Sequence, residues 1–363
     1  MRVILSGGGT GGHIYPAIAI ADAIKKRHPD AEILFVGTKR GMEGELVPKR
    51  GYPIRFVTVS GFNRRNLLKS FKTLRDLSKG IKEAKTILKE FKPDLVIGTG
   101  GYVCGPVLRV AGKKGLPAYI HEQNAFPGMT NKLLEKHVRN IFLSFPEGAK
   151  YFKSQDKLTT VGNPIRKEFL DGDKGYREEL GIAKDDFVVL SFGGSRGATR
   201  LNEVMTAAAE KLGGEDKFRM IFITGSVHYE KIRKELQDKG ILDKGRITLL
   251  PYADDIYKYF FASDLVISRS GALTVSEITA CGKASILIPS PNVTGNHQFF
   301  NAKVVADPGG AVLIEEKDLT EEKLASEILR LKNDRALLEK MGKISKEAAR
   351  LDAAEKICDH LGI

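Results

Sequence analysis

The chain has 363 residues, a mass of 39.9 kDa and a formal net charge of +13. This length suffices for two domains with their own cores, and a composition of 42% hydrophobic and 28% charged residues argues against a disordered chain. No apolar run reaches the ~18 residues needed to cross a bilayer, and three scattered cysteines predict neither a disulfide framework nor a zinc site. The first residues predict a strand instead of a signal peptide, so we expect the protein in the cytoplasm.

The N-terminal residues predict a phosphate-binding turn. The short strand Val3–Leu5 leads into Gly7-Gly8-Gly9-Thr10-Gly11-Gly12, and a helical pattern follows from Ile14 to Ile24. Glycines let the backbone approach an anion, and the N–H groups and dipole of the helix point at it. His13 follows this turn directly. An ionisable side chain beside a phosphate site favours a catalytic role over phosphate binding alone.

Strand and helix patterns alternate through the first half, which indicates a parallel sheet wound on both faces. The end of one strand, Gly98–Gly105, is again rich in glycine, and two such turns predict a second phosphorylated ligand. His121–Asn124 are polar and follow a buried strand at once, which is costly unless they contact a ligand or one another. The further strands predicted here are Glu32–Val36, Ile54–Val59, Asp94–Ile97, Ala118–Ile120, Asn140–Leu143 and Thr159–Val161.

Basic charge is concentrated in the first half of the chain. Residues 1–165 hold 28 Lys and Arg against 13 Asp and Glu, whereas residues 166–363 hold 30 against 32. Such a half is attracted to an anionic surface, whether a membrane, a nucleic acid or a polyphosphate substrate. A basic amphipathic helix begins in this half, and its first part predicts membrane contact through Arg64, Arg65, Leu67, Leu68 and Phe71.

The second half repeats the opening pattern after a boundary near Gly162–Pro164. The strand Phe187–Phe192, a glycine turn over 193–197 and a helix from Thr199 to Leu212 follow in order. Ser270-Gly271 opens another helix, whose N–H groups are suited to a diphosphate, while Glu277 is suited to ribose hydroxyls. The further strands predicted are Met220–Thr224, Ile247–Leu250, Leu265–Ser268, Ser285–Pro289 and Ala311–Ile314. Helical residues from about 318 to 361 predict a helix that returns onto the first domain.

A dinucleotide-binding oxidoreductase is one alternative. The first turn satisfies the GxGxxG pattern, but no acidic residue follows the second strand, which ends at Val36-Gly37-Thr38-Lys39-Arg40. Arg40 is suited to a 2′-phosphate, so an NADP enzyme stays open. It would bind a nicotinamide cofactor in a fluorescence titration.

Together these motifs resemble one family closely, the UDP-N-acetylglucosamine:undecaprenyl-diphospho-muramoylpentapeptide N-acetylglucosaminyltransferases (MurG) of bacterial cell-wall synthesis. The resemblance runs over nearly the whole chain and rests on Gly7–His13 with Pro16, Gly100–Pro106, His121–Asn124, Gly162–Arg166, Gly193–Ala198, Arg269–Glu277 and His297-Gln298 with Asn301. It implies an α/β protein of the GT-B fold, with two Rossmann-like domains facing an interdomain cleft. Residues 1–163 would bind the acceptor and the membrane, residues 164–340 would bind UDP-GlcNAc, and residues 341–363 would form a helix packing back on the first domain.

The resemblance also implies the activity. The expected reaction moves N-acetylglucosamine from UDP-GlcNAc to the muramoyl C4 hydroxyl of lipid I, giving lipid II with inversion. The expected enzyme needs no metal or other cofactor and works at the cytoplasmic face of the bacterial inner membrane as a peripheral protein. Its expected partners are UDP-GlcNAc, undecaprenyl-linked lipid I, an anionic membrane surface and proteins of cell-wall assembly, with no nucleic acid.

Residue roles follow from the resemblance position by position. His13 is the candidate general base, and it is equally suited to hydrogen-bond a phosphate. The donor-binding positions are Thr10, Gly11, Gly12, Asn124, Arg166, Ser195, Ala253, Arg269, Ala272, Leu273, Thr274, Val275, Ser276, Glu277, Gln298 and Asn301; the acceptor-binding positions are Gly9, Gly100, Gly101, Tyr102 and Gly105. Two residues depart from the family's usual pattern, since Arg196 replaces Gln and Cys104 replaces Ser.

Two other functions are compatible with these motifs. A UDP-GlcNAc 2-epimerase shares the fold and the donor but needs no lipid, and it would form UDP-ManNAc without an acceptor. A nucleotide-sugar sensor at the membrane would bind UDP-GlcNAc tightly and turn nothing over. The basic first half and its apolar segment favour the transferase over the epimerase.

Overall fold

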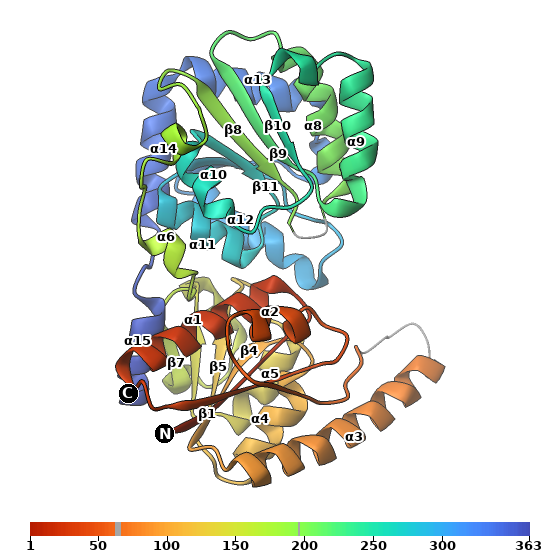
Figure 1. The fold of residues 1–363 in the computed structure, drawn as a ribbon. Helices are drawn as coiled ribbons and strands as arrows, with labels where there is room; N and C mark the ends of the chain where they lie inside the picture. The colour runs from red at the N-terminus through yellow and green to blue at the C-terminus, as the bar shows by residue number, and fades with distance from the viewer. Residues whose placement is uncertain (62–66, 195–196) are drawn as a thin grey trace. The chain divides into compact units, whose positions relative to one another are not determined.

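The computed structural model describes residues 1–61, 67–194 and 197–363, with the side chains of 67–72 left out. The chain forms two compact units (Figure 1). Unit 1 comprises Met1–Arg166 together with Arg350–Ile363, and unit 2 comprises Lys167–Ala349. Each unit is an α/β structure built on one parallel sheet.

The sheet of unit 1 has the strand order β3-β2-β1-β4-β5-β6-β7, with every pair parallel. Its first six strands follow the order of a dinucleotide-binding Rossmann sheet, in which the chain reverses direction between the first and fourth strands. The strands are β1 (Arg2–Gly7), β2 (Glu32–Gly37), β3 (Ile54–Phe56), β4 (Leu95–Gly100), β5 (Ala118–Glu122), β6 (Asn140–Leu143) and β7 (Leu158–Thr160).

Helices cover both faces of this sheet, because successive side chains of a buried strand point to opposite sides. Val3 and Leu5 of β1 join the core under α1 and α15, whereas Ile4 joins the core under α3 and α4. The helices of unit 1 are α1 (Gly11–Arg27), α2 (Glu43–Lys49), α3 (Leu67–Phe91), α4 (Cys104–Lys113), α5 (Met129–Leu134) and α15 (Ala353–Leu361), with short 3-10 helices at Glu135–His137, Pro146–Tyr151 and Gln155–Lys157.

The C-terminal helix α15 lies along α1 in unit 1 (Figure 1). Ile357 and Cys358 are fully buried in the core beside α1. The Arg27 guanidinium donates to Glu355 at 2.8 Å and to Asp359 at 2.6 Å. Apolar burial and two ion pairs therefore hold this last helix on the unit with which the chain begins.

Unit 2 repeats the same sheet, with the strand order β10-β9-β8-β11-β12-β13 and parallel pairing throughout. The strands are β8 (Phe187–Phe192), β9 (Phe218–Ile223), β10 (Ile247–Leu250), β11 (Leu265–Ser268), β12 (Ala284–Leu287) and β13 (Ala311–Leu313). The helices are α6 (Lys167–Leu170), α7 (Tyr176–Glu179), α8 (Thr199–Leu212), α9 (Ser226–Asp238), α10 (Ile256–Ala262), α11 (Ala272–Cys281), α12 (His297–Ala306), α13 (Glu321–Asn333) and α14 (Arg335–Glu347), with 3-10 helices at Leu242–Lys244, Thr294–Asn296 and Glu316–Asp318.

The bounds differ from the sequence expectation at two places that matter for function. β5 continues through Glu122, because His121 and Glu122 pair with Phe142 and Leu143 of β6. The chain returns to unit 1 at Arg350 instead of at residue 341, because α14 packs on α11 and β12 of unit 2. Among the described residues, none of the helices has both the length and the apolar character required to cross a bilayer.

Candidate active site

Two glycine turns meet at the point in unit 1 where the sheet reverses direction. One follows β1 and the other follows β4, and these two strands are neighbours in the sheet. Gly9, Gly100 and Gly101 have φ values of +87°, +109° and +82°, which side chains other than glycine rarely adopt. Ligands of open α/β sheets bind at this position, outside the carboxyl ends of the strands.

His13 lies in the first turn of α1, directly behind the first glycine turn. Its Nδ1 atom is 3.0 Å from the carbonyl oxygen of Thr99 and 2.9 Å from Oε1 of Gln123. A Cβ atom on Gly100 would lie 2.6 Å from the same Nδ1. Gly100, expected as an acceptor-binding residue, therefore also provides the space that the His13 ring occupies.

A buried polar chain continues behind His13. Nε2 of Gln123 lies 2.9 Å from Nδ1 of His121 and donates to the His121 carbonyl oxygen at 3.1 Å. Nε2 of His121 lies 2.9 Å from the carbonyl oxygen of Gly162. Complete burial lowers the pKa of His121 to about 4. Gln123 therefore contacts both His121 and His13.

Glu43 stabilises the first glycine turn through hydrogen bonds. The sequence analysis did not identify this residue. It is fully buried at the start of α2, and one carboxylate oxygen accepts from Gly9 N at 2.9 Å. The other accepts from the amide and the hydroxyl of Thr38, both at 2.8 Å. A glutamate in a helical pattern resembles any solvated surface residue, so the sequence carried no signal for this role.

Glu122 has a similar function for the second half of the polar segment. One oxygen accepts from the backbone and side-chain amides of Asn124 at 2.9 and 3.1 Å. The other accepts from Gly128 N at 2.9 Å and from Asn131 Nδ2 at 2.8 Å. The carboxylate thus orients the Asn124 side chain, which the resemblance assigned to the donor.

The remaining unit 1 positions surround these turns. Cys104 donates its thiol to the carbonyls of Ser6 and Gly100 at 3.0 Å each, and burial raises its pKa to about 11, so it stays protonated. Tyr102 is exposed, and Gly105 lies in the first turn of α4. The guanidinium of Arg166 lies 4.9 Å from the centre of the Tyr15 ring. Arg64 and Arg65 lie outside the described residues, as do the side chains of Leu67, Leu68 and Phe71.

Unit 2 contains a polar cavity of ≈ 410 Å³ at the corresponding end of its sheet. The N-terminus of α8 faces this cavity through Ala198 and Thr199, and the N-cap residue, Ala198, has no side-chain group that could cap the helix. An uncapped helix N-terminus attracts anions. The full lining is Gly193, Gly197, Ala198, Thr199, Arg200, Glu203, Arg269, Ser290, Asn292, Gln298 and Glu316. Ser195 and Arg196, for which the sequence predicted a position in the glycine turn, lie outside the described residues.

Arg269 organises one wall of this cavity. Its guanidinium forms an ion pair with Glu316 and donates to the carbonyls of Ile288 and Pro289 at 3.2 Å each. Both charged side chains are largely buried, with 12% and 21% of their surface exposed. Glu316 therefore already neutralises the positive charge of Arg269. The contact expected between Arg269 and the leaving diphosphate would compete with this ion pair.

The other donor positions lie along the same edge. The side chain of Gln298 accepts from Ser290 N at 2.8 Å, and Asn301 donates to the Ser270 carbonyl at 3.2 Å. α11 begins at Ala272 without a side-chain cap, and Ala253 lies in the loop after β10. Leu273, Thr274 and Ser276 are half-buried, whereas Val275 and Glu277 are buried. The N–H of Val275 donates to the Gly271 carbonyl oxygen at 2.9 Å.

Comparison with known proteins extends these observations over the whole chain. Residues 3–143 match the glycosyltransferase family 28 N-terminal domain, and residues 188–357 match the glycosyltransferase family 28 C-terminal domain. A UDP-N-acetylglucosamine--N-acetylmuramyl-(pentapeptide) pyrophosphoryl-undecaprenol N-acetylglucosamine transferase of Thermoanaerobacter sp. (strain X514) is 48% identical over 362 residues, which is 98% of each chain.

Two solved structures resemble the whole chain. The crystal structure of Acinetobacter baumannii MurG has a TM-score of 0.77 and 28% identity, and the match covers 99% of both chains. A UDP-GlcNAc 2-epimerase from Neisseria meningitidis, solved with UDP-GlcNAc, has a TM-score of 0.71 over 99% of both chains. Its identity is 14%, so it shares the fold alone.

The two Rossmann-like units and the two domain matches define a glycosyltransferase of the GT-B fold. Within that class, the chain belongs to the MurG family of UDP-N-acetylglucosamine--N-acetylmuramyl-(pentapeptide) pyrophosphoryl-undecaprenol N-acetylglucosamine transferases.

Proposed function

We propose that this protein transfers N-acetylglucosamine from UDP-GlcNAc to the muramoyl C4 hydroxyl of lipid I, with inversion, and so forms lipid II for peptidoglycan synthesis. The observation that carries the proposal is the 48% identity to a transferase of that name over 98% of both chains. The epimerase alternative is supported only by a similar fold at 14% sequence identity, which is weaker support.

Unit 2 would bind the donor. The uncapped N-termini of α8 and α11 present N–H groups and positive dipole ends, which stabilise the charge that develops on the departing UDP. We assign donor contacts to Ser195, Ala253, Arg269, Ala272, Leu273, Thr274, Val275, Ser276, Glu277, Gln298 and Asn301. No bound metal is required for this stabilisation, and we expect the reaction to proceed in EDTA. Among the described residues, no cluster of three or more His, Cys, Asp or Glu side chains is suited to a metal ion.

Unit 1 would bind the acceptor and remove its proton. The glycine turns around Gly9, Gly100 and Gly101 expose backbone at the position where open α/β sheets bind phosphates. His13 stands beside them and is partly exposed, and a histidine side chain is suited to act as a general base. Thr10, Gly11, Gly12, Asn124 and Arg166 would complete the site from this unit.

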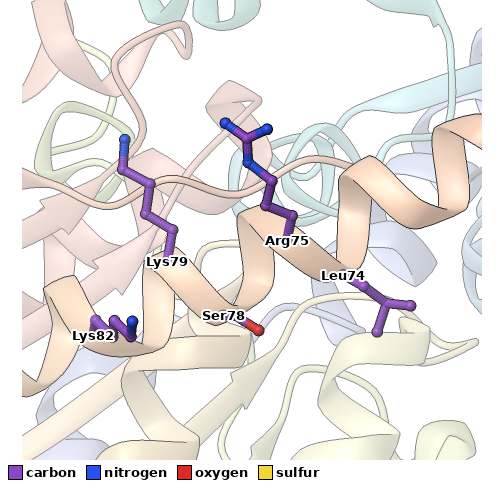
Figure 2. A pocket seen from close by; sticks show the side chains of 5 residues that line it. All are labelled: Leu74, Arg75, Ser78, Lys79 and Lys82. Atoms are coloured by element: carbon purple, nitrogen blue, oxygen red, sulfur yellow. The ribbon is translucent and has the colours of Figure 1, made fainter.

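Helix α3 would hold the protein on the cytoplasmic face of the membrane. Its described middle part exposes Leu74, Arg75, Ser78, Lys79 and Lys82, which line an open groove along the helix. Figure 2 shows Arg75 and Lys79 pointing to one side of the helix and Leu74 to another. Basic side chains beside exposed apolar ones favour an interface with anionic lipid. Arg64, Arg65, Leu67, Leu68 and Phe71 extend this surface in the proposal.

Radiolabelled UDP-GlcNAc tests the function directly. The protein is incubated with a lipid I analogue in EDTA, and the label is followed into an organic extract. Label in the lipid phase supports the transferase and its independence of metal. Label that stays in the aqueous phase, beside an active control enzyme, would reject the proposal, and UDP-ManNAc in that phase would identify an epimerase.

A further inference from the structure

His13, Gln123, His121 and Gly162 form a row of hydrogen bonds. Their geometry determines which ring nitrogen of each histidine carries a hydrogen. Each link is short: 2.9 Å between His13 Nδ1 and Gln123 Oε1, 2.9 Å between Gln123 Nε2 and His121 Nδ1, and 2.9 Å between His121 Nε2 and Gly162 O. The chain ends at a backbone carbonyl, which can only accept a hydrogen bond. The protons can therefore be assigned one after another from that end.

His121 is the first group to be assigned. Its Nε2 lies 2.9 Å from the Gly162 carbonyl, which can only accept, and 3.4 Å from the hydroxyl oxygen of Ser144, which can accept as well as donate. The shorter contact, to the carbonyl, assigns a hydrogen to Nε2. Complete burial disfavours the charged ring, whose pKa is lowered to about 4, so His121 is neutral near pH 7. A neutral imidazole has one N–H, and Nδ1 of His121 is therefore an acceptor.

The amide of Gln123 follows. Its nitrogen lies 2.9 Å from the accepting Nδ1 of His121 and 3.1 Å from the His121 carbonyl oxygen, and it donates to both. A flipped amide would place Oε1 against these two acceptors and leave both without a donor. The oxygen of Gln123 must then face His13.

His13 is the last group in the chain. Its Nδ1 lies between two acceptors, Gln123 Oε1 at 2.9 Å and Thr99 O at 3.0 Å. This nitrogen carries the hydrogen in either charge state. The neutral ring consequently has its lone pair on Nε2, the nitrogen that is left to accept a proton.

We propose that Gln123, oriented by His121, is a positioning residue that holds neutral His13 in the Nδ1–H tautomer and keeps Nε2 as the proton acceptor. The proposal rests on the proposed function in assigning that lone pair to the acceptor hydroxyl. The arrangement resembles the general logic of a base whose tautomer is set by a third group behind it. Here a neutral amide and a buried neutral imidazole take the place of a carboxylate.

Histidine NMR tests the tautomers in the intact protein. Protein labelled with ¹⁵N-histidine is measured at about pH 8, above the ordinary histidine pKa of ~6.5, and resonances are assigned by their loss in His13→Gln and His121→Gln. We expect His13 as the Nδ1–H form and His121 as the Nε2–H form. The Nε2–H form of His13 in the wild-type protein would overturn the proposal without reference to any variant.

Two variants test the role of Gln123. Gln123→Met keeps the size of the side chain and removes its three hydrogen bonds, so part of His13 should move to the Nε2–H form. His121→Phe removes the acceptor that orients Gln123 and should cause a smaller shift in the same direction. Asn140→Leu is the matched control, because it removes another buried amide of unit 1, whose hydrogen bond goes to Thr159 instead. An unchanged His13 tautomer in Gln123→Met would reject the positioning role.

Kinetics separate this proposal from the proposed function. Gln123→Met should lower kcat about tenfold, less than the ~10²-fold loss for removing the base, while KM for UDP-GlcNAc changes little. A shifted tautomer with an unchanged kcat would overturn the positioning role together with the base role of His13. Absence of transfer by the wild-type enzyme would overturn the proposed function, and the NMR measurement would still decide the tautomer.

Discussion

The backbone amide of Gly9 donates to the carboxylate of Glu43 at 2.9 Å and so ties the first glycine turn to the helix that follows β2. The same carboxylate accepts from Thr38 at the end of β2. Added Cβ atoms at Gly8 and Gly41 would lie 2.3 and 2.0 Å from Glu43 oxygens. Glycines at these positions therefore make room for a buried carboxylate.

Glu43→Gln should destabilise unit 1 and loosen this turn. The new amide group turns an acceptor into a donor that faces N–H groups, and a buried donor left without an acceptor costs about 1–3 kcal/mol. Urea unfolding measures the loss, and KM for the lipid acceptor should rise with it. Glu45→Gln is the control, since Glu45 is exposed and pairs with Lys49 on the surface. Equal stability of the two variants would contradict a fastening role for Glu43.

His13→Ala should lower kcat by ~10²-fold or more, the usual contribution of a general base. The exposed His28 at the end of α1 provides a control, and His28→Ala should retain activity. The transfer assay with radiolabelled UDP-GlcNAc measures kcat and KM for each variant. A loss confined to KM would show that His13 binds a phosphate instead of accepting the proton.

Gly100→Ala should lower activity through the His13 ring. Its Cβ would lie 2.6 Å from His13 Nδ1, so the ring must leave its place between Thr99 and Gln123. Gly115→Ala is a matched control, because Gly115 also has a positive φ but a Cβ there meets nothing within 4 Å. Both variants pay about 1–2 kcal/mol for the left-handed backbone. Only Gly100→Ala should change kcat, and equal kcat values would refute the steric link.

Stability should fall in mild acid because of His121. Its folded-state pKa of about 4 lies below the ordinary value of ~6.5, so the unfolded chain binds more protons between these two values. The contribution of His121 is present above about pH 6.5 and is lost as the pH falls toward 4, up to roughly 3 kcal/mol. His121→Gln cannot titrate, and its melting temperature should depend less on pH over this window. Parallel pH curves for the two proteins would rule the contribution out.

Arg269→Lys should raise KM for UDP-GlcNAc. An ammonium cannot reach Glu316 and two carbonyls at once as the guanidinium does, so the segment from Pro289 to Gln298 loses its anchor. Arg177→Lys is a suitable control, because Arg177 also pairs with a carboxylate and donates to carbonyls in unit 2 but lies outside the cavity. Isothermal titration with UDP measures binding apart from turnover. Equal affinity losses in both variants would mean a general loss of stability.

The fold could be predicted well where a buried strand ends in a glycine turn. The strand Phe187–Phe192 and the helix Thr199–Leu212 have the predicted bounds, because an apolar run, a glycine turn and a 3.6-residue period are all local signals. The end of β5 was predicted too early. His121 and Glu122 are polar and look like loop residues, but hydrogen bonds to β6 keep them in the strand, and that pairing is not visible in the local sequence.

The candidate site was predictable in its outline but not in its supporting contacts. The glycines are recognisable because a phosphate-binding turn needs them at fixed spacing, and His13 is recognisable because it follows them directly. Glu43 was missed, because its partners Gly9 and Thr38 come from other elements. Val275 was expected at the donor because it lies inside a motif, and only the structure places its side chain in the core. Long-range contacts of this kind depend on the packing of distant segments.

The position of α15 has a consequence for how the protein is made. Because Arg350–Ile363 belong to unit 1, the unit that leaves the ribosome first receives its last helix only after all of unit 2 has been synthesised. Until Ile357 and Cys358 arrive, the apolar surface of α1 that they cover is open to solvent or to chaperones. The folding of unit 2 does not depend on a later segment, because Lys167–Ala349 is continuous. The second unit in sequence order can thus be the first to finish folding, and a fragment that stops at Arg166 would be an incomplete unit.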